Sequence, residues 1–482
     1  MKEKIKTFIS SEKNVFYTLL ALLTIYFLYI LLKTEGYIGG ADSLTHYRYS
    51  RFSWLYPEFL LHHWAKPVFT LLTSPFAQFG HDGVSVFNIT AGIFSCMLAY
   101  LSARKLGYSY RLLLPFFILF SPIYSIFIIS GLTEVLFGLF MIATTYLCLD
   151  KKHLWAAILI SFSPLVRTEG IMIVPVFALY FMVVKQFRYL PFLFTGFIVY
   201  SIIGYFHFND IFWLITQMPY TGSASAYGTG ALTHFFLKSP EHFGQFTMIL
   251  ISIGIIAMIY NFMLGKNKHA QSEVLLIFLP FLIYFLGHVF MWWSGIGKSL
   301  GMDRYMVAIV PLGSLLALRG LNVFSSLPKK LTQNKWSKII FGVAVLAMIF
   351  TQSFNTMRNL PRKPGGMDKV MHSASEFIKQ EELHKNKIYY NDPGFFYFIG
   401  FNPLDNNSAQ SFTIQIAENT KELNQGDVLI WDGHFSALRG IQLDSLQTNP
   451  YLNELGVFEP KKPFKIFDTD YKVAVFQRND KQ

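Results

Sequence analysis

Several ionisable side chains of this sequence stand beside long apolar runs, where they could act on a charged substrate. They are Asp42, Glu134, Arg167 and Arg304. A carboxylate in surroundings of reduced polarity can accept a proton as a general base. A guanidinium binds phosphate well, because its planar fork donates two parallel hydrogen bonds. Together these residue types favour a site that holds a phosphate or a pyrophosphate near a carboxylate.

Each of these residues also has a structural interpretation. Asp42 precedes an amphipathic stretch and could cap a helix, since Asp is a good N-cap residue. It is the only carboxylate from Gly36 to Pro57, so no close neighbour can replace it. Charged residues at helix ends can also extend to the water interface at little cost. Spacing alone therefore leaves both the catalytic and the structural interpretation of Asp42 open.

A metal site and a disulfide framework are not expected from the sequence. His46, His62 and His63 lack the spacing of a zinc signature, and the adjacent pair points to opposite sides of a helix. Cys96 and Cys148 lie inside apolar runs. Free cysteine in such runs behaves as a small hydrophobic residue, so we expect both thiols to be structural.

The composition indicates what kind of elements must position these groups. Of 482 residues, 52% are hydrophobic, 17% are aromatic and only 15% are charged. Ordinary soluble domains are about a quarter charged, so the chain is predicted to lie in a membrane. The net charge of +12 comes from short basic clusters between apolar runs. This pattern orients membrane proteins and lacks the aromatic-rich basic stripe of nucleic-acid binders, so no nucleic-acid partner is expected.

Long apolar runs predict an α-helical polytopic membrane protein. A spanning helix needs about 20 mostly apolar residues. The sequence predicts about eleven such helices, at approximately 15–32, 83–103, 112–129, 132–149, 154–166, 170–184, 190–207, 245–264, 273–292, 305–324 and 338–354. The first run is longer than the apolar core of a signal peptide, so we expect it to remain as an uncleaved span.

The basic residues between these runs fall on one side of the membrane when the N-terminus is placed inside. The loops assigned to the cytoplasm carry Arg104, Lys105, Arg111, Lys151, Lys152, Lys185, Arg188, Lys266, Lys268, Lys329, Lys330, Lys335 and Lys338. Basic loops stay in the cytoplasm, and an odd number of spans then puts the C-terminal tail outside. We therefore expect a multi-pass plasma-membrane protein, in a bacterium an inner-membrane protein, in contact with membrane lipids.

The segments assigned to the outer side are long enough to do chemistry. They cover about 34–82, 208–244 and 355–482. Within the last, residue patterns predict a helix over 367–381 and short strands over 388–390, 395–399, 428–431 and 473–476. The expected organisation is a transmembrane catalytic domain, residues 1–354, followed by an extracytoplasmic (periplasmic) α/β domain, residues 355–482.

Short motifs at the outer span ends resemble those of the GT-C superfamily of integral-membrane glycosyltransferases, which use polyprenyl-phosphate sugars. The motifs are Asp42 in the first outer loop, the Ser-Gly-Leu-Thr-Glu turn ending at Glu134, the Leu-Val-Arg-Thr-Glu-Gly stretch around Arg167, and Asp303-Arg304-Tyr305 before an apolar span with Pro311. The resemblance covers roughly residues 10–355 and is nearest to the dolichyl- or polyprenyl-phosphate mannose type and its bacterial relatives. It implies a GT-C-like fold.

The resemblance also implies a reaction. A hexose, mannose-like, would pass with inversion from a polyprenyl-phosphate sugar to an extracytoplasmic glycan, lipid or protein acceptor. Asp42 would take the proton of the acceptor hydroxyl. Because a phosphate leaving group needs little acid assistance, one base and a set of phosphate-binding cations suffice. The cations would neutralise the phosphate charge. The residues expected to bind substrate are Arg167, Arg304, Lys298, His46, Glu134 and Tyr305.

The first outer loop departs from the pattern of many relatives, which carry two neighbouring acidic residues there. Asp42 is followed by Ser43 and has no adjacent second acid. Glu58, Asp210 and Asp303 are distant substitutes. No cofactor is assigned on this basis, a divalent cation stays open, and the lipid-phosphate sugar is the donor substrate.

Other functions also fit a polytopic protein of this kind. A transporter or flippase of lipid-linked sugars would place polar residues near the bilayer midplane, whereas the charges here cluster at span ends. A polysaccharide ligase or polymerase would also be a membrane transferase, but it would use long lipid-linked glycans. The sequence favours the transferase of a single sugar and leaves both alternatives open.

Overall fold

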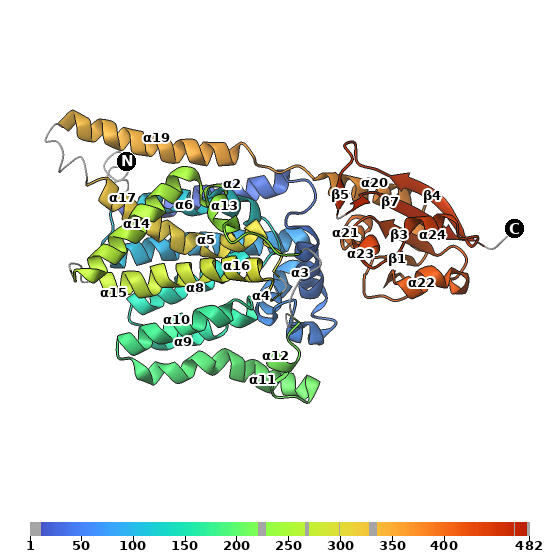
Figure 1. Ribbon diagram of the computed structural model, residues 1–482, viewed down its shortest axis with the longest axis horizontal. Coiled ribbons are helices and arrows are strands. Elements are labelled where there is room, and N and C mark those ends of the chain that lie inside the picture. The colour runs from blue at the N-terminus through green and yellow to red at the C-terminus, as the bar shows by residue number, and fades with distance from the viewer. Residues whose placement is uncertain are drawn as a thin grey trace, which may run out of the picture. The chain divides into compact units, whose positions relative to one another are not determined.

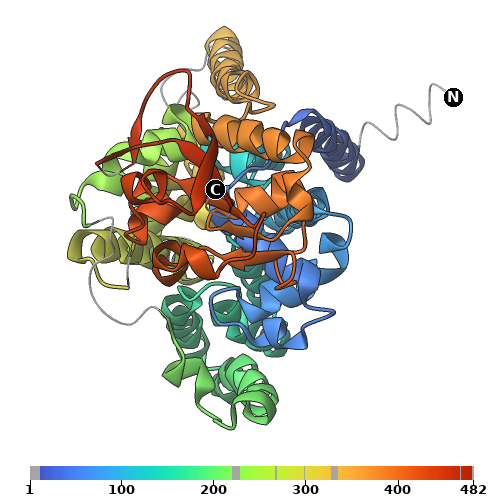
Figure 2. The ribbon, with the colours of Figure 1, turned by 90° about the vertical axis from the view of Figure 1, so that its right-hand side faces the viewer.

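Helices make up most of the computed structural model, which describes residues 11–219, 228–265, 269–297, 299–326, 335–466 and 468–479. The helices of the first 361 residues lie side by side in Figure 1 and are seen closer to end-on in Figure 2. The longer ones are α2 (Glu12–Lys33), α4 (Pro67–Ala77), α5 (His81–Lys105), α8 (Glu134–Leu149), α9 (His153–Ser161), α10 (Gly170–Val183), α11 (Thr195–Phe208), α13 (His234–Phe243), α14 (Gln245–Met263), α16 (Leu279–Ser294), α17 (Val310–Phe324) and α19 (Lys335–Met357).

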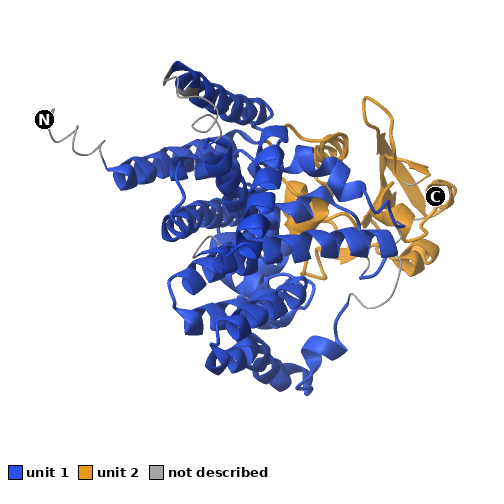
Figure 3. Ribbon diagram, turned by 60° about the vertical axis from the view of Figure 1, so that its left-hand side comes forward, with its two compact units in different colours: residues 1–34, 46–361 blue, residues 35–45, 362–482 orange. Residues whose placement is uncertain are grey.

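The chain divides into two compact units (Figure 3). The first comprises Met1–Thr34 and His46–Pro361, and the second comprises Glu35–Thr45 and Arg362–Gln482. The domain boundary expected at residue 354 falls inside α19, because this helix continues to Met357. The second unit also takes in the short segment Glu35–Thr45, which contains Asp42.

Apolar helices of membrane-spanning length confirm a multi-pass membrane protein. By length and composition, seven helices of the described residues could cross a membrane, and four shorter apolar helices accompany them. The seven are Glu12–Lys33, His81–Lys105, Phe187–Phe208, Gln245–Met263, Ala270–Ser294, Asp303–Phe324 and Ile339–Met357. Seven of the eleven runs predicted from the sequence coincide with these seven helices. The runs at 132–149, 154–166 and 170–184 coincide with shorter apolar helices, and the run at 112–129 coincides with neither kind.

The run at 112–129 is not one helix. It forms two short helices, α6 (Leu114–Leu119) and α7 (Pro122–Phe127), which are separated at Ser121. Ser121 is extended, with ψ 129°. The ring of Pro122 disfavours the helical conformation in the residue before it, and proline has no N–H to donate. Conversely, the apolar helix α4, which begins at Pro67, is absent from the predicted spans, because its 11 residues are too few to cross a membrane.

Two glycines bring α14 and α17 into backbone contact. A Cβ on Gly254 would lie 2.0 Å from the carbonyl oxygen of Leu316, and one on Gly320 would lie 1.9 Å from that of Leu250. No other residue fits at either position without separating the helices. Small residues at such crossings allow the close packing that holds membrane helices together.

The second unit contains a five-stranded sheet in the order β2-β1-β3-β7-β4. The strands are β1 (Ile388–Tyr390), β2 (Ala409–Ser411), β3 (Val428–Asp432), β4 (Leu452–Phe458) and β7 (Val473–Arg478). The first three are parallel, with Ile388 opposite both Ala409 and Val428, and β7 runs antiparallel to β3 and β4. A separate hairpin joins β5 (Lys465–Ile466) to β6 (Thr469–Asp470).

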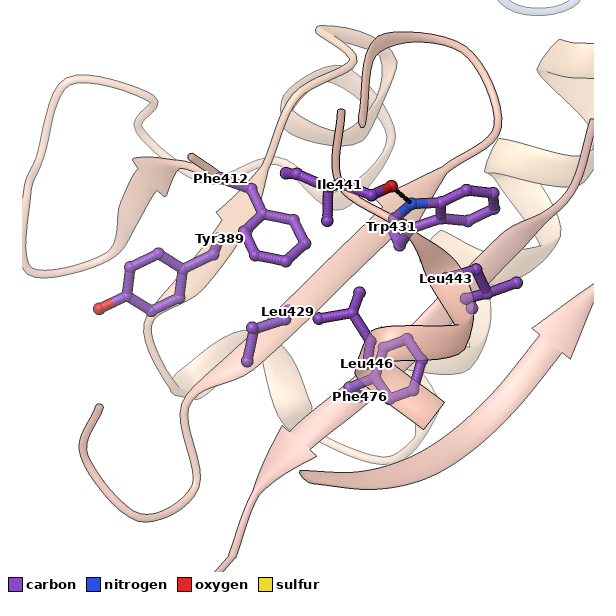
Figure 4. Packing of buried hydrophobic residues seen from close by; sticks show 9 residues of the cluster. Tyr389, Phe412, Leu429, Trp431, Ile441, Leu443, Leu446 and Phe476 are labelled. Carbon is purple, nitrogen blue, oxygen red and sulfur yellow. Dashed lines mark hydrogen bonds between the residues drawn. The ribbon is translucent and has the colours of Figure 1, made fainter. Parts of the chain in front are cut away.

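An apolar core covers one face of this sheet (Figure 4). Alternate residues of neighbouring strands contribute to it, including Tyr389, Leu429 and Phe476. Trp431 is buried in the same cluster and donates its indole N–H to the carbonyl of Ile441 at 2.8 Å. The indole therefore contributes apolar area without leaving its polar atom unpaired.

The tail follows the sequence prediction in its main elements. The predicted helix is α20 (Gly366–Gln380), and the strands at 388–390, 428–431 and 473–476 are confirmed as β1, β3 and β7. The strand predicted at 395–399 is wrong, because these residues form helix α21 (Gly394–Ile399). Asp392 accepts a hydrogen bond from the amide of Gly394 at the start of this helix. Gly400, with φ 91°, ends it in the left-handed conformation that glycine adopts readily.

Candidate functional site

A cluster of charged side chains lies in the first unit where three short junctions meet. Glu134 is the first residue of α8, and Arg167 lies in the turn between η3 (Ser163–Leu165) and α10. Arg304 and Tyr305 lie in η6 (Asp303–Ile309), a 3₁₀ helix that leads directly into α17. Glu134 is 1% exposed and Arg167 is 8% exposed, so both charges are removed from water.

The guanidinium of Arg167 joins two carboxylates. Its Nη1 lies 2.7 Å from Glu134 Oε1 and also donates to the hydroxyl of Thr133 at 3.0 Å. Its Nη2 donates to Glu169 Oε1 at 2.6 Å. A buried charge is tolerated when it is paired in this way. The two arms of the fork thus hold the start of α8 and the turn before α10 at a fixed separation.

Arg304 and Tyr305 complete the cluster. Arg304 Nε lies 3.5 Å from Glu134 Oε1, a longer contact than those of Arg167. The Tyr305 ring lies 5.4 Å from the guanidinium of Arg167 and stacks on the imidazole of His288 at 4.6 Å. The structure therefore brings together four residues that the sequence singled out: Glu134, Arg167, Arg304 and Tyr305.

Lys66 adds a further cation to this region. Its ammonium is buried and donates to the hydroxyl of Thr168 at 2.7 Å and to the carbonyl of His63 at 3.2 Å. Burial lowers the pKa of Lys66 to about 7, the negative charge of Glu169 opposes this, and Arg167 adds to it. The backbone of Lys66 is left-handed, with φ 69°. Such strain in a non-glycine residue is common at functional sites.

The cluster is rich in cations. Three basic side chains (Lys66, Arg167 and Arg304) lie close to two carboxylates (Glu134 and Glu169). Cations held together in a buried setting favour an anionic ligand, such as a phosphodiester. The carboxylate of the neighbouring Asp303 is paired with Lys238 at 2.9 Å.

An apolar cavity of about 140 Å³ adjoins this cluster. It is lined by His63, Pro67, Ser161, Pro164, Leu165, Thr168, Ile171, Phe197, Leu214, Ile215 and Met218. Lys66 donates hydrogen bonds to two of these lining residues, His63 and Thr168. A cation therefore stands at the wall of an apolar cavity, which is an arrangement that fits a ligand with an anionic head and an apolar tail.

His46 supports the turn that carries Lys66. Its ring is buried, stacks on Trp64 at 4.8 Å, and its Nδ1 lies 3.2 Å from the carbonyl oxygen of Ala65. These contacts hold the two residues before Lys66. Contact of His46 with a substrate stays a prediction.

Asp42 lies in the first turn of α3 (Gly40–Phe52), and its side chain is half-buried. Because the helix begins at Gly40, Asp42 is inside the first turn and does not occupy the N-cap position. It belongs to the second unit, through the segment Glu35–Thr45. Lys298 lies outside the described residues. Within the described part of the chain, no group of three His, Cys, Asp or Glu side chains is arranged to hold a metal ion.

The sequence patterns did not identify three residues of this region, Lys66, Thr168 and His288. Lys66 is the last ionisable residue before the apolar helix that starts at Pro67, and this position was a usable signal. His288 stands inside a long apolar run, and an ionisable residue within a span usually has a function. Thr168 carried no signal of its own, because it is recognised only by its contact with Lys66.

Solved structures of membrane glycosyltransferases resemble this chain over most of its length. No protein-family model matches the sequence, and no curated protein is significantly similar to it. ArnT from Cupriavidus metallidurans, bound to undecaprenyl phosphate, matches with a TM-score of 0.62 at 10% identity, over 95% of this chain and 97% of that chain. The oligosaccharyltransferase AglB from Archaeoglobus fulgidus, in complex with an inhibitory peptide and a dolichol-phosphate, matches with a TM-score of 0.54 at 12% identity, over 86% and 69%.

A further structural match is the arabinofuranosyltransferase AftD from mycobacteria, with a TM-score of 0.52 at 9% identity, over 96% of this chain and 40% of that chain. At these identities the likeness establishes the fold. The GT-C fold predicted from the sequence, with its small C-terminal sheet domain, is therefore confirmed.

Proposed function

We propose that this protein is a membrane glycosyltransferase that moves a sugar from a polyprenyl phosphate to an extracytoplasmic acceptor. The observation that carries the proposal is the buried, cation-rich cluster at the wall of an apolar cavity. A polyprenyl-phosphate sugar has the matching chemistry, with an anionic head and an apolar tail. Structures with the same fold have been solved with undecaprenyl phosphate and with a dolichol-phosphate.

In this proposal the cations bind the leaving group. Lys66, Arg304 and Arg167 face the phosphate, whose negative charge grows as the sugar departs. Preorganised donors at the position where charge develops stabilise the transition state more than the ground state. Tyr305 and Glu134 hold the two guanidiniums in place. Lys298 and His46 are further candidates for substrate contact.

Asp42 is the proposed general base. The acceptor oxygen attacks the anomeric carbon while the bond between that carbon and the phosphate oxygen breaks. The acceptor proton passes to the Asp42 carboxylate, and the electron pair of the broken bond stays with the phosphate. The configuration at the anomeric carbon is inverted. The motif resemblance favours a mannose-like hexose as the sugar, and a glycan, lipid or protein as the acceptor.

Transfer of a labelled sugar tests the proposal directly. The purified protein in proteoliposomes would receive polyprenyl-phosphate mannose, the corresponding glucose and arabinose donors, and an undecaprenyl-linked oligosaccharide, with acceptor lipids and glycans in the medium. Sugar covalently joined to an acceptor supports the proposal, and parallel reactions with EDTA and with Mg²⁺ decide the metal requirement. Movement of intact donor across the bilayer without transfer would instead indicate a flippase, and transfer of only the oligosaccharide would indicate a ligase.

The orientation in the membrane follows from the basic loops and is a separate prediction. A cysteine introduced at the exposed Lys461 should react with an impermeant maleimide in intact cells, whereas one at the exposed Lys151 should react only after permeabilisation. The native thiols give a clean background, because Cys96 and Cys148 are both buried. The reverse labelling pattern would overturn the proposed topology.

The apolar cavity predicts a variant that weakens donor binding without touching the charged cluster. Leu214→Trp should raise the donor KM about tenfold or more, because overfilling a packed cavity costs roughly 1–3 kcal/mol. The value of kcat should change little. Ile202→Trp is the matched control, because Ile202 is exposed on α11 and does not line the cavity. An unchanged KM in a folded Leu214→Trp protein would show that the donor lipid lies elsewhere.

A further inference from the structure

The order of the strands in the second unit's sheet creates a topological switch point at the carboxyl ends of β1 and β3. These strands are parallel, and β1 lies between β2 and β3 in the sheet. The chain leaves β1 for β2 on one side and later returns to β3 on the other side. At such a switch point the carboxyl ends of the strands open a crevice. Asp392 follows β1, and Asp432 is the last residue of β3.

Both carboxylates are buried at this position. Asp432 accepts hydrogen bonds from the amides of His434 and Phe435 and from the hydroxyl of Ser436. Burial raises the pKa of Asp392 to about 8, and the neighbouring Asp432 adds to this. The crevice therefore favours a partner that can donate a hydrogen bond and brings no negative charge.

Tyr37, from the segment Glu35–Thr45, lies close to this end of the sheet. The side chain of Tyr37 is 7% exposed, and its ring lies 5.2 Å from the ring of Tyr397 and 5.8 Å from that of Phe398. Its hydroxyl is hydrogen-bonded to the carboxylate of Asp368. A Cβ on Gly394 would lie 3.1 Å from the Tyr37 hydroxyl, so a glycine directly after Asp392 and Pro393 leaves room for it.

Tyr37 holds this loop on the N-terminal side of Asp42, and the fully buried Ser43 and Leu44 hold it on the other side. Tyr397 also donates its hydroxyl to the carbonyl of Gly36 at 3.4 Å. Of residues 34–42, all of which are described, Tyr37 alone is buried. Gly36, Gly39 and Gly40 have φ of 77°, 101° and 65°. Glycines in these conformations leave the backbone free to reorganise. Asp42 follows immediately, in the first turn of α3.

We propose that Tyr37 is a positioning residue, and that its docking in the second unit holds the loop so that Asp42 occupies its working position. The inference rests on the proposed function, in which Asp42 is the base. It gives the C-terminal unit a role in the reaction through a tyrosine anchor five residues before the carboxylate. Misplacing a catalytic group by about 1 Å can cost around a hundredfold in rate, so a single anchor is sufficient for a large effect.

Kinetics of matched variants test the consequence. Tyr37→Ala should lower kcat by about ten- to a hundredfold and leave the donor KM near the wild-type value, because the phosphate is bound by residues of the first unit. Tyr37→Phe keeps the ring contacts but loses the hydrogen bond to Asp368, so its kcat should lie between those of the wild type and Tyr37→Ala. Tyr471→Phe is the control. The hydroxyl of Tyr471 is buried in the same region and has no hydrogen-bond partner among the described residues. Tyr471 also lies far in sequence from the segment that carries Asp42.

A spin label tests the docking itself without any assay of transfer. Ala41→Cys in the full-length protein would be labelled, with the buried Cys96 and Cys148 as the background, and its mobility measured by electron paramagnetic resonance. Tyr37→Ala should increase the mobility of the label, and Tyr471→Phe should not.

The two measurements separate the possible failures. Equal mobility with and without Tyr37 overturns the proposal, whatever the activity. Increased mobility with unchanged kcat also overturns it, because the anchor would then not matter for the reaction. If the wild-type chain transfers no sugar, the proposed function fails, and the spin label alone decides whether Tyr37 holds the loop.

Discussion

Asp42→Asn is expected to lower kcat by about 10²–10⁴-fold, the usual contribution of a general base. The amide has nearly the same shape as the carboxylate but cannot accept the proton of the acceptor hydroxyl. Donor binding should persist, because the proposed phosphate contacts come from Lys66, Arg167 and Arg304. The measurement is a pair of assays on one purified variant, donor binding and sugar transfer.

A structural role for Asp42 makes the opposite forecast. Because Asp42 lies in the first turn of α3, its charge could stabilise the helix dipole, which is worth about 0.3–1 kcal/mol. Loss of that interaction would slightly lower the melting temperature and leave kcat intact. Glu35→Gln is the matched control, since Glu35 is an exposed carboxylate in the same loop segment. Full turnover in a folded Asp42→Asn protein would remove the proposed base.

Arg167→Lys is expected to raise the donor KM by about ten- to a hundredfold, since a charge-assisted hydrogen bond worth roughly 1.5–3 kcal/mol is lost. The two arms of the guanidinium reach different carboxylates, Glu134 at 2.7 Å and Glu169 at 2.6 Å. A single ammonium cannot hold both and also face a phosphate. The measurement is steady-state kinetics against donor concentration, with the thermal midpoint recorded in parallel.

The ion pairs of Arg167 call for a second variant, because breaking a buried pair alone costs roughly 3–5 kcal/mol. Replacing Arg167, Glu134 and Glu169 together with Gln removes Arg167 and both carboxylates that pair with it, and it also removes the longer contact of Glu134 with Arg304. If Arg167 binds the donor, this triple variant should recover the thermal midpoint and keep the high KM. Recovery of KM together with stability would show that Arg167 only ties the helices, and Arg304 would become the principal phosphate ligand.

Hydrophobic periodicity and the positions of turn residues predicted most helices and the central strands. The predictions were wrong where the effect of a proline or a glycine was underestimated. The run at 112–129 has enough apolar residues for a span, but Pro122 divides it. The residues at 395–399 are apolar and aromatic like a strand, yet Asp392 and Gly400 start and stop a helix there. Both local signals were present in the sequence, and the apolar content outweighed them.

The candidate site was predicted in part. Glu134, Arg167, Arg304 and Tyr305 were identifiable because each stands at the end of an apolar run. Their pairing was not, since Arg167 chooses between several carboxylates only when the helices pack. Lys66 is recognised as a site residue through its contact with Thr168, about a hundred residues away in sequence, and no local pattern encodes such a contact.

The backbone contact between α14 and α17 has a mechanical consequence for the site. Helices that meet at Gly254 and Gly320 with no side chain between them can neither slide nor rotate past one another. In the span Asp303–Phe324, which carries Arg304 and Tyr305, 78% of an apolar 18-residue stretch is buried, against 28% of such a stretch in Phe187–Phe208 beside the cavity. Arg304 thus belongs to a closely packed span, while the cavity wall is formed partly by the less buried helix α11. We expect donors with different lipid tails to be accommodated by outward bending of α11, with the phosphate held at one unchanging position.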